Sequence, residues 1–135
     1  MNKSIEVLNI DTIQSRGNMN VLENNKNPLP FEIKRIFYMY DVDINDSRGN
    51  HANLFSQFVF IALQGSVDID ITYLNGVKEC IHLNRPDRAL YIPNMIWKKM
   101  YSFSKDCILL ILSDKLYDKN EYIYDINSFF ERECC

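Results

Sequence analysis

The stretch VDIDITYLNGVKECIHL, residues 67–83, decides the fold class. In its first half, Val67–Tyr73, apolar residues alternate with aspartates, so one face of an extended chain is apolar and the other is charged. Asn75-Gly76 follows, a pair that tolerates the positive φ angles of a tight turn, and Val77–Leu83 then forms a second strand-like run. The pattern predicts a β-hairpin with one buried face.

Further short runs of apolar, aromatic and β-branched residues lie on both sides of this hairpin, with turn residues between them. These runs are Glu32–Val42, Gln57–Leu63, Ala89–Ile92 and Asp106–Ser113. Short strands between turn signals favour a sandwich or a barrel, so we predict an all-β fold. Only the tail, Asp118–Glu131, has apolar residues at helical spacing, which predicts a helix at one end of the barrel. We expect residues 1–135 to form one domain.

The composition excludes several classes of function. Of the 135 residues, 47% are hydrophobic and 24% are charged, as in ordinary globular proteins, and the net charge is -3. Nothing in it suggests the basic face of a nucleic-acid-binding protein. The longest apolar stretch, Phe58–Leu63, is much shorter than the roughly 20 residues that span a bilayer, and the first residues lack a signal-peptide pattern. We therefore expect a cytoplasmic protein that binds neither nucleic acid nor membrane.

A polar cluster around His51 is the candidate site. Residues 48–53 read RGNHAN, and in a strand the side chains of His51 and Asn53 point to the same face, where Gln57 is expected to join them. The row Gly49, His51, Asn53, Gln57, Gly65 resembles the first motif of the cupins, a superfamily of β-barrels. One imidazole, neutral amides and a lysine make a poor set of ligands for Zn²⁺ or Fe²⁺, so we predict no metal and no cofactor.

A single histidine in such a pocket is suited to proton transfer, because imidazole titrates near neutral pH. Moving a carbonyl to the neighbouring carbon requires a base that removes the proton beside the ketone and returns it to the other carbon. Asn53 is placed to hydrogen-bond the oxygen of the enediolate that forms between these steps. The alternative is that His51 is structural, as a lone histidine on a strand more often is; its polar neighbours argue for the functional interpretation.

A series of short motifs runs through most of the chain in a fixed order. They are Arg16-Gly17-Asn18, Pro30–Arg35, Arg48–Ala52, Gly65-Ser66, Leu83–Pro86, Leu90–Pro93, Ile96-Trp97, Phe103-Ser104, Leu112–Asp114, Tyr117-Asp118 and Tyr122–Asp125. With these motifs, the segment from Arg16 to about Phe129 resembles the dTDP-4-keto-6-deoxyglucose 3,4-ketoisomerases, the WxcM-like sugar isomerases of the cupin superfamily.

The resemblance implies a fold, a reaction and a partner. The fold is a cupin-type β-barrel (jelly roll) with a short C-terminal helix, usually in a homodimer with exchanged N-terminal strands. The substrate is a dTDP-linked 4-keto-6-deoxy sugar, and the product, a dTDP-3-keto-6-deoxyhexose, feeds an aminotransferase that makes 3-amino-3,6-dideoxy sugars for surface polysaccharides or glycosylated natural products. No metal takes part.

The chain also departs from the family pattern. Many members have a second histidine where Asn53 stands, and Phe37 replaces a common tyrosine, although Tyr38 remains beside it. Lys98 stands where relatives carry histidine or arginine, and that position is expected to contact the sugar. Arg16 matches one subgroup of the family.

Several other residues have both a functional and a structural interpretation. Arg35 and Arg48 are candidates for holding the diphosphate, because a guanidinium matches phosphate oxygens, with surface ion pairs as the alternative. Lys98 is a candidate for reaching phosphate or sugar. Trp97 and Tyr38 either stack on thymine or pack in the core.

The leading hypothesis is a 3,4-ketoisomerase in which His51 is the acid/base, assisted by Asn53 and by either Tyr38 or Lys98. Arg16, Arg35, Arg48, Gln57, Trp97 and Lys98 are the expected substrate-binding residues. Two alternatives stay open from the sequence: a related sugar epimerase and a non-catalytic module that binds dTDP-sugars.

Overall fold

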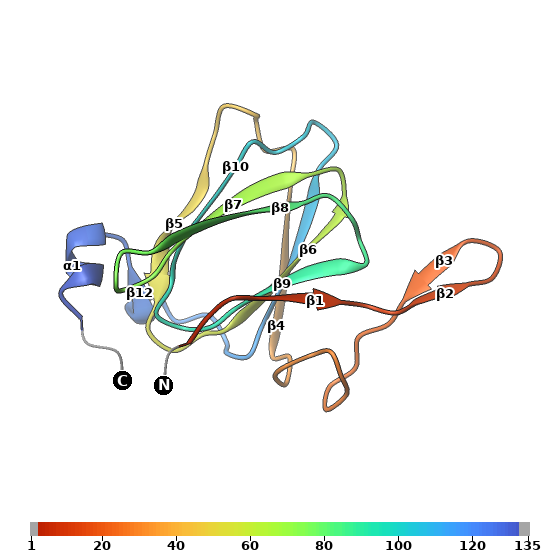
Figure 1. The fold of residues 1–135 in the computed structure, drawn as a ribbon, viewed down its shortest axis with the longest axis horizontal. Helices are drawn as coiled ribbons and strands as arrows, with labels where there is room; N and C mark the ends of the chain where they lie inside the picture. Colours follow the sequence, from red (N-terminus) through yellow and green to blue (C-terminus); the bar gives the residue numbers. More distant parts are fainter. Residues whose placement is uncertain (1–2, 133–135) are drawn as a thin grey trace.

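The computed structural model describes residues 3–132, and its regular secondary structure is almost entirely β-strand (Figure 1). The strands are β1 (Glu6–Asn9), β2 (Thr12–Gln14), β3 (Asn18–Asn20), β4 (Arg35–Tyr40), β5 (Arg48–Asn53), β6 (Phe58–Gln64), β7 (Val67–Thr72), β8 (Lys78–Leu83), β9 (Arg88–Ile92), β10 (Trp97–Tyr101), β11 (Ile108–Ser113) and β12 (Tyr122–Ile123). The helices are a 3₁₀ turn, η1 (Lys119–Glu121), and α1 (Ile126–Phe130). The predicted all-β fold with a short C-terminal helix is confirmed.

Two five-stranded sheets enclose the core. One has the strand order β1-β9-β6-β11-β4 and the other β12-β5-β10-β7-β8, and every pairing is antiparallel. The predicted hairpin is β7–β8, with Ile69 opposite Ile81 and a turn closed by the Gly76 amide on the Tyr73 carbonyl. Along β7 the residues with apolar side chains are buried and the aspartates lie on the outer face, as the alternation predicted.

The apolar run in β6 is buried on both of its faces. Phe58 and Phe60 point into the core between the sheets, whereas Val59 and Ile61 pack outward in a second cluster with Leu8, Leu29 and Leu112. Because the segment between β3 and β4 covers this outer surface, β6 shows a continuous apolar run instead of an alternating one.

The tail is helical over less of the range Asp118–Glu131 than the spacing predicted. Tyr122 and Ile123 form a strand that pairs with Asn53 and Ala52 of β5, and it separates the 3₁₀ turn η1 from the α-helix α1, Ile126–Phe130. The Asp125 side chain accepts a hydrogen bond from the Ser128 amide at the start of this helix. An aromatic and a β-branched residue fit a half-buried sheet edge, so pairing with β5 prevails over helix here.

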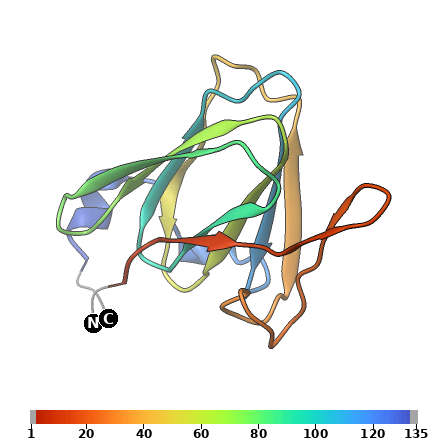
Figure 2. The ribbon, with the colours of Figure 1, turned by 45° about the vertical axis from the view of Figure 1, so that its right-hand side comes forward.

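The hairpin β2–β3 lies apart from the barrel. In Figures 1 and 2 it extends away from the two sheets as a separate arm. Ile13 and Met19 pair across this arm, and both side chains are exposed. Within the described part of the chain, no helix is long and apolar enough to cross a membrane.

Candidate active site

A β-bulge in β5 sets the geometry of the site. On β10, Lys98 pairs with His51 and Lys99 pairs with Gly49, so Asn50 is an extra residue between them. Asn50 and Gly49 both have positive φ angles, and a Cβ on Gly49 would lie 3.0 Å from the Lys98 carbonyl oxygen, which explains the glycine. Without the bulge, Arg48 and His51 would point to opposite faces because they are three residues apart; with it, both line one pocket.

The pocket opens between the two sheets and has a volume of about 270 Å³. Its lining is mostly apolar and aromatic, with a few polar groups: Phe37, Met39, Arg48, Gly49, His51, Phe58, Phe60, Lys98, Met100, Ile111, Tyr122 and Tyr124. We call it the His51 pocket. Its size is at the lower end for ligand sites, so it suits a sugar ring better than a whole nucleotide sugar.

Lys98 is the most deeply buried polar group of this pocket, with only 2% of its surface exposed. Its Nζ donates a hydrogen bond to Asn53 Oδ1 at 2.9 Å and lies 4.5 Å from the centre of the Phe58 ring. Burial lowers the pKa of Lys98 to about 7; the nearby Glu121 carboxylate opposes this shift and the Arg35 guanidinium adds to it.

His51 is half-buried on the same face as Lys98. Its ring packs against Tyr122, with ring centres 4.8 Å apart, and against Tyr124 at 5.8 Å. Burial lowers the pKa of His51 to about 4, and the positive charge of Lys98 adds to that effect. The imidazole is therefore neutral at pH 7 and able to accept a proton.

Two polar groups at the site have unused hydrogen-bonding capacity within the described residues. Arg35 Nε and Nη2 and Asn53 Nδ2 are buried and have no partner there. The Arg35 guanidinium lies 5.0 Å from the Phe37 ring centre and 5.9 Å from that of Phe58, the ring that Lys98 also contacts. A buried hydrogen-bond donor without a partner destabilises the folded protein, so these atoms are placed to donate to an acceptor that a ligand supplies.

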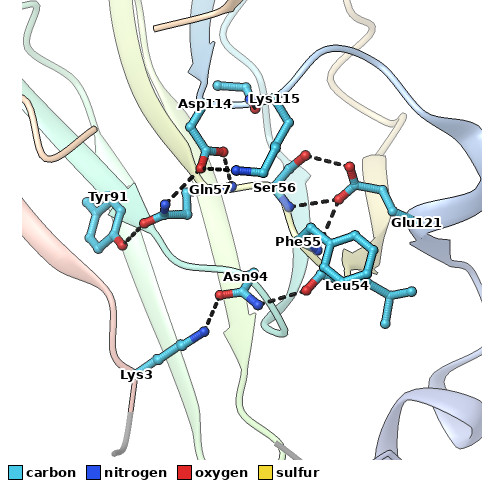
Figure 3. Close-up of polar contacts among 11 residues, drawn as sticks. Lys3, Leu54, Phe55, Ser56, Gln57, Tyr91, Asn94, Asp114, Lys115 and Glu121 are labelled. Carbon is cyan, nitrogen blue, oxygen red and sulfur yellow. Dashed lines mark hydrogen bonds and ion pairs between the residues drawn. The ribbon is translucent and has the colours of Figure 1, made fainter. Parts of the chain in front are cut away.

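Glu121 supplies the negative charge that opposes the lowering of the Lys98 pKa, and it also holds the chain beside the pocket (Figure 3). Its carboxylate accepts hydrogen bonds from the Ser56 amide at 2.8 Å, the Ser56 hydroxyl at 2.7 Å and the Phe55 amide at 3.3 Å. These bonds tie η1 to the end of β5 and so place Tyr122, the next residue, against His51.

Gln57 does not join His51. Figure 3 shows its side chain between Asp114 and Tyr91: Nε2 donates to Asp114 Oδ2 at 2.8 Å, and Oε1 accepts from the Tyr91 hydroxyl. Both hydrogen-bonding ends of the amide are thus occupied within the chain. The chain bends between β5 and β6, and this bend ends the alternation that would place Gln57 beside Asn53.

The structure also leaves Tyr38, Trp97 and Arg16 outside the His51 pocket. Tyr38 is 62% exposed, on the face of β4 opposite to Arg35 and Phe37. Trp97 directly precedes Lys98 in β10, so it points to the outer face, where it packs on Phe129 at 5.8 Å. Arg16 lies at the tip of the β2–β3 arm, away from the barrel (Figure 1). These three side chains therefore lie outside the His51 pocket of their own chain, and their expected roles in catalysis and substrate binding stay predictions.

Sequence reasoning missed Glu121, Tyr122 and Tyr124 at this site. The apolar spacing of the tail predicts a helix there, but Tyr122 and Tyr124 are also two residues apart, which is the spacing of side chains that share one face of an extended chain. Within residues 3–132, no three or more His, Cys, Asp and Glu side chains gather in a way that could hold a metal ion; the expectation of no metal stays a prediction.

The family and structure comparisons agree with one another. A family model described as FdtA: WxcM-like, C-terminal matches residues 2–133. The TDP-4-oxo-6-deoxy-alpha-D-glucose-3,4-oxoisomerase of Aneurinibacillus thermoaerophilus is 36% identical over 117 residues, which are 87% of this chain and 83% of that protein.

Solved structures give the same result. WlaRA, a TDP-fucose-3,4-ketoisomerase from Campylobacter jejuni, is 50% identical, with a TM-score of 0.90 over 96% of this chain and 95% of that chain. A mutant of the 3,4-ketoisomerase QdtA from Thermoanaerobacterium thermosaccharolyticum, in complex with TDP-4-keto-6-deoxyglucose, is 30% identical, with a TM-score of 0.90 over 97% of this chain and 94% of that chain. The cupin-type barrel that the sequence resemblance implied is confirmed by this likeness. The chain therefore belongs to the FdtA, WxcM-like family of sugar 3,4-ketoisomerases.

Proposed function

We propose that this protein is a 3,4-ketoisomerase that converts dTDP-4-keto-6-deoxyglucose into a dTDP-3-keto-6-deoxyhexose by acid/base catalysis. The observation that carries the proposal is the neutral His51 imidazole, which lines a pocket together with the buried Lys98. The Arg35 guanidinium, which has buried nitrogens, adds positive charge near Lys98. A neutral base beside positive charge is what enolisation requires, because negative charge develops on the ketone oxygen as the carbon-bound proton leaves.

In this mechanism His51 takes the proton from carbon 3 of the sugar and returns it to carbon 4. The Asn53 amide, whose Nδ2 is buried without a partner among the described residues, donates a hydrogen bond to an oxygen of the enediol. The reaction needs no redox cofactor, because the oxidation level of the sugar as a whole does not change. The product suits transamination at carbon 3, the step that leads to 3-amino-3,6-dideoxy sugars.

Arg35 and Arg48 are the proposed diphosphate-binding residues. Arg35 has two buried nitrogens without partners in the described chain and lies near the ring of Phe58, which lines the His51 pocket; Arg48 lines that pocket from the other sheet. A guanidinium donates to phosphate oxygens in a fork that matches their geometry. Trp97, Tyr38 and Gln57 are not given a role in this pocket, because their side chains lie elsewhere. A cytoplasmic location stays a prediction from the sequence.

We propose a homodimer in which the β2–β3 arm packs on a second copy of the chain. The arm extends away from its own barrel and exposes the apolar pair Ile13 and Met19. Contact with a second chain would bury these two side chains and so stabilise the arm. Arg16 at its tip is far from its own pocket, so the second copy is the place where it is able to meet substrate. Replacing Ile13 and Met19 together by glutamate is expected to shift the protein from dimer to monomer in sedimentation equilibrium; a wild-type monomer would contradict the proposal.

The test of the function is product analysis. The protein is incubated with dTDP-4-keto-6-deoxyglucose, and the sugar is followed by NMR. A carbonyl carbon that moves from position 4 to position 3 supports the isomerase. An inverted stereocentre with the carbonyl still at position 4 would show an epimerase, and saturable binding of dTDP without any change in the sugar would show a binding module.

A further inference from the structure

A 3,4-ketoisomerisation moves two hydrogens, not one. The hydrogen on carbon 3 must reach carbon 4, and the hydroxyl proton on oxygen 3 must reach oxygen 4. If one imidazole serves the carbons, the oxygens require a second group that both donates and accepts a proton.

Few side chains of the His51 pocket meet this requirement. The Arg48 guanidinium stays charged under all ordinary conditions and does not release a proton. Tyr124 is mostly exposed at the mouth of the pocket, and Tyr122 packs against the imidazole itself. Phe37 and Asn53 carry no group that exchanges a proton under these conditions. Lys98 remains: it is the cross-strand partner of His51, so both side chains reach the same space from adjacent strands.

The contacts of Lys98 orient its ammonium group without satisfying it. An ammonium has three N–H donors, and the described residues give Nζ one hydrogen bond, to Asn53 Oδ1 at 2.9 Å. The Phe58 ring fixes it from one side at 4.5 Å. Two N–H groups are therefore left for two acceptors, and the vicinal oxygens 3 and 4 of a sugar are such a pair.

We propose that Lys98 is a second catalytic residue, which carries the hydroxyl proton between oxygen 3 and oxygen 4 while His51 carries the carbon-bound proton. This inference rests on the proposed function. Asn53 then acts as a positioning residue for Lys98, in addition to contacting the enediol.

The steps balance without another reactant. His51 takes the proton from carbon 3, the electrons of that C–H bond form the C3=C4 double bond, and the electrons of the C4=O4 bond move to oxygen 4, which takes a proton from the Lys98 ammonium. The neutral amine then takes the proton from oxygen 3, the C3=O3 bond forms, and carbon 4 takes the proton from the His51 imidazolium. Both residues return to their starting states.

The electrostatic surroundings of Lys98 suit this role. The charged and titratable groups that face it are Glu121 from η1, Arg35 from β4 and His51 from β5. Burial and Arg35 outweigh Glu121, so the pKa of Lys98 falls to about 7, and near neutral pH the group gives and takes a proton with similar ease.

The experiment compares Lys98→Met, Lys98→Arg and the matched control Lys99→Met. Lys99 is the next residue but lies on the outer face of β10, with its Nζ 5.3 Å from the Tyr101 ring centre. We expect Lys98→Met to lower kcat/KM about 10²–10⁴-fold, the usual contribution of a general acid/base, while the Kd for TDP changes little. Lys99→Met is expected to stay within about twofold of the wild type, as surface substitutions usually do.

Lys98→Arg separates proton transfer from simple charge. The wild-type kcat/KM is expected to rise as pH passes about 4, where His51 becomes neutral, and to fall above about 7, where Lys98 loses the proton that it must donate. Arginine keeps its proton, so Lys98→Arg should be slow and should lose the fall above neutral pH.

Three results would overturn the inference while leaving the proposed function intact. They are a Lys98→Met variant that isomerises at the wild-type rate, a Lys98→Arg variant that keeps the wild-type alkaline fall, and a loss of TDP affinity with an unchanged kcat. A wild-type protein that forms no 3-keto product would overturn both proposals. Because Lys98→Arg keeps the charge and the long stem, it gives the answer even if Lys98→Met does not fold.

Discussion

The burial of Lys98 makes a prediction about stability that needs no substrate. In the folded protein its pKa is about 7, against 10.5 for an ordinary lysine. Between these two pH values the unfolded chain binds more protons than the folded one, so the free energy of unfolding rises with pH. Below about pH 7 Lys98 is charged in both the folded and the unfolded protein, so burying its charge destabilises the folded state by the full amount. Above pH 10.5 the amine is neutral in both, and this destabilisation is absent.

The size of the effect follows from the same two values. Between about pH 7 and about pH 9, the linkage relation gives a contribution from this one group of about 2 kcal/mol to the free energy of unfolding. Lys98→Met removes the titration and replaces a buried charge by an apolar side chain of similar length, a type of change that is neutral or stabilising by about 1–4 kcal/mol. We therefore expect the variant to be more stable than the wild type near pH 7 and the difference to shrink by about 2 kcal/mol toward pH 9.

Urea denaturation at several pH values measures this difference, with the protein concentration held constant because an associating chain gains stability by mass action. Subtracting the free energy of unfolding of Lys98→Met from that of the wild type at each pH cancels the titration of the other groups. Lys99→Met, on the outer face, is the control and should leave the pH dependence unchanged. A difference between wild type and Lys98→Met that stays constant from pH 7 to about pH 9 would refute the burial of a titrating lysine at this position.

Two further predictions concern the turn after β6 and the diphosphate. Gly65→Ala should lower the free energy of unfolding by about 2–5 kcal/mol, because φ is +70° and a Cβ would lie 2.2 Å from Ser104 Oγ and 2.9 Å from Cys107 Cα. Gly76→Ala, where φ is +87° but the space is open, should lower it by only about 1–2 kcal/mol. Equal losses of stability for the two variants in a denaturation experiment would contradict this reasoning. Arg35→Met should weaken TDP binding about 10- to 100-fold in calorimetry, because one charge-assisted contact to the diphosphate is lost. The control Arg85→Met, at an exposed ion pair with Asp87, should leave TDP binding unchanged. If Arg35→Met also binds TDP as the wild type does, Arg35 is not a substrate-binding residue.

The fold was predictable because its main signals are local. Alternation in residues 67–83, with Asn75-Gly76 between its halves, is enough to specify a hairpin, and the observed β7 and β8 lie within the predicted runs. The family resemblance then supplied the barrel topology, which no local pattern contains. The β10 strand was missed because the run WKKMY has two lysines, one of which is buried only through contacts with β5.

The site was predicted in part, and strand parity explains the misses. His51 and Asn53 are brought together by Lys98, as their i, i+2 spacing indicated. Because side chains alternate between the two faces of a strand, adjacent residues point in opposite directions. Trp97 and Lys98 therefore cannot both enter one pocket, and neither can Phe37 and Tyr38. The bulge at Asn50, which places Arg48 beside His51, depends on backbone geometry and was not visible in the residue types alone.

The central claim is that His51 moves a proton between neighbouring carbons of a keto sugar, and one measurement tests it most directly. Wild-type protein and His51→Asn are each incubated with dTDP-4-keto-6-deoxyglucose in D₂O, and the sugar is analysed by NMR, with TDP binding measured in parallel. The N–H proton of the His51 imidazolium exchanges with D₂O, so we predict a 3-keto product that carries solvent deuterium for the wild type. For His51→Asn we predict normal TDP binding with neither product nor deuterium. Isomerisation by His51→Asn at the wild-type rate would contradict the assignment of His51 as the acid/base.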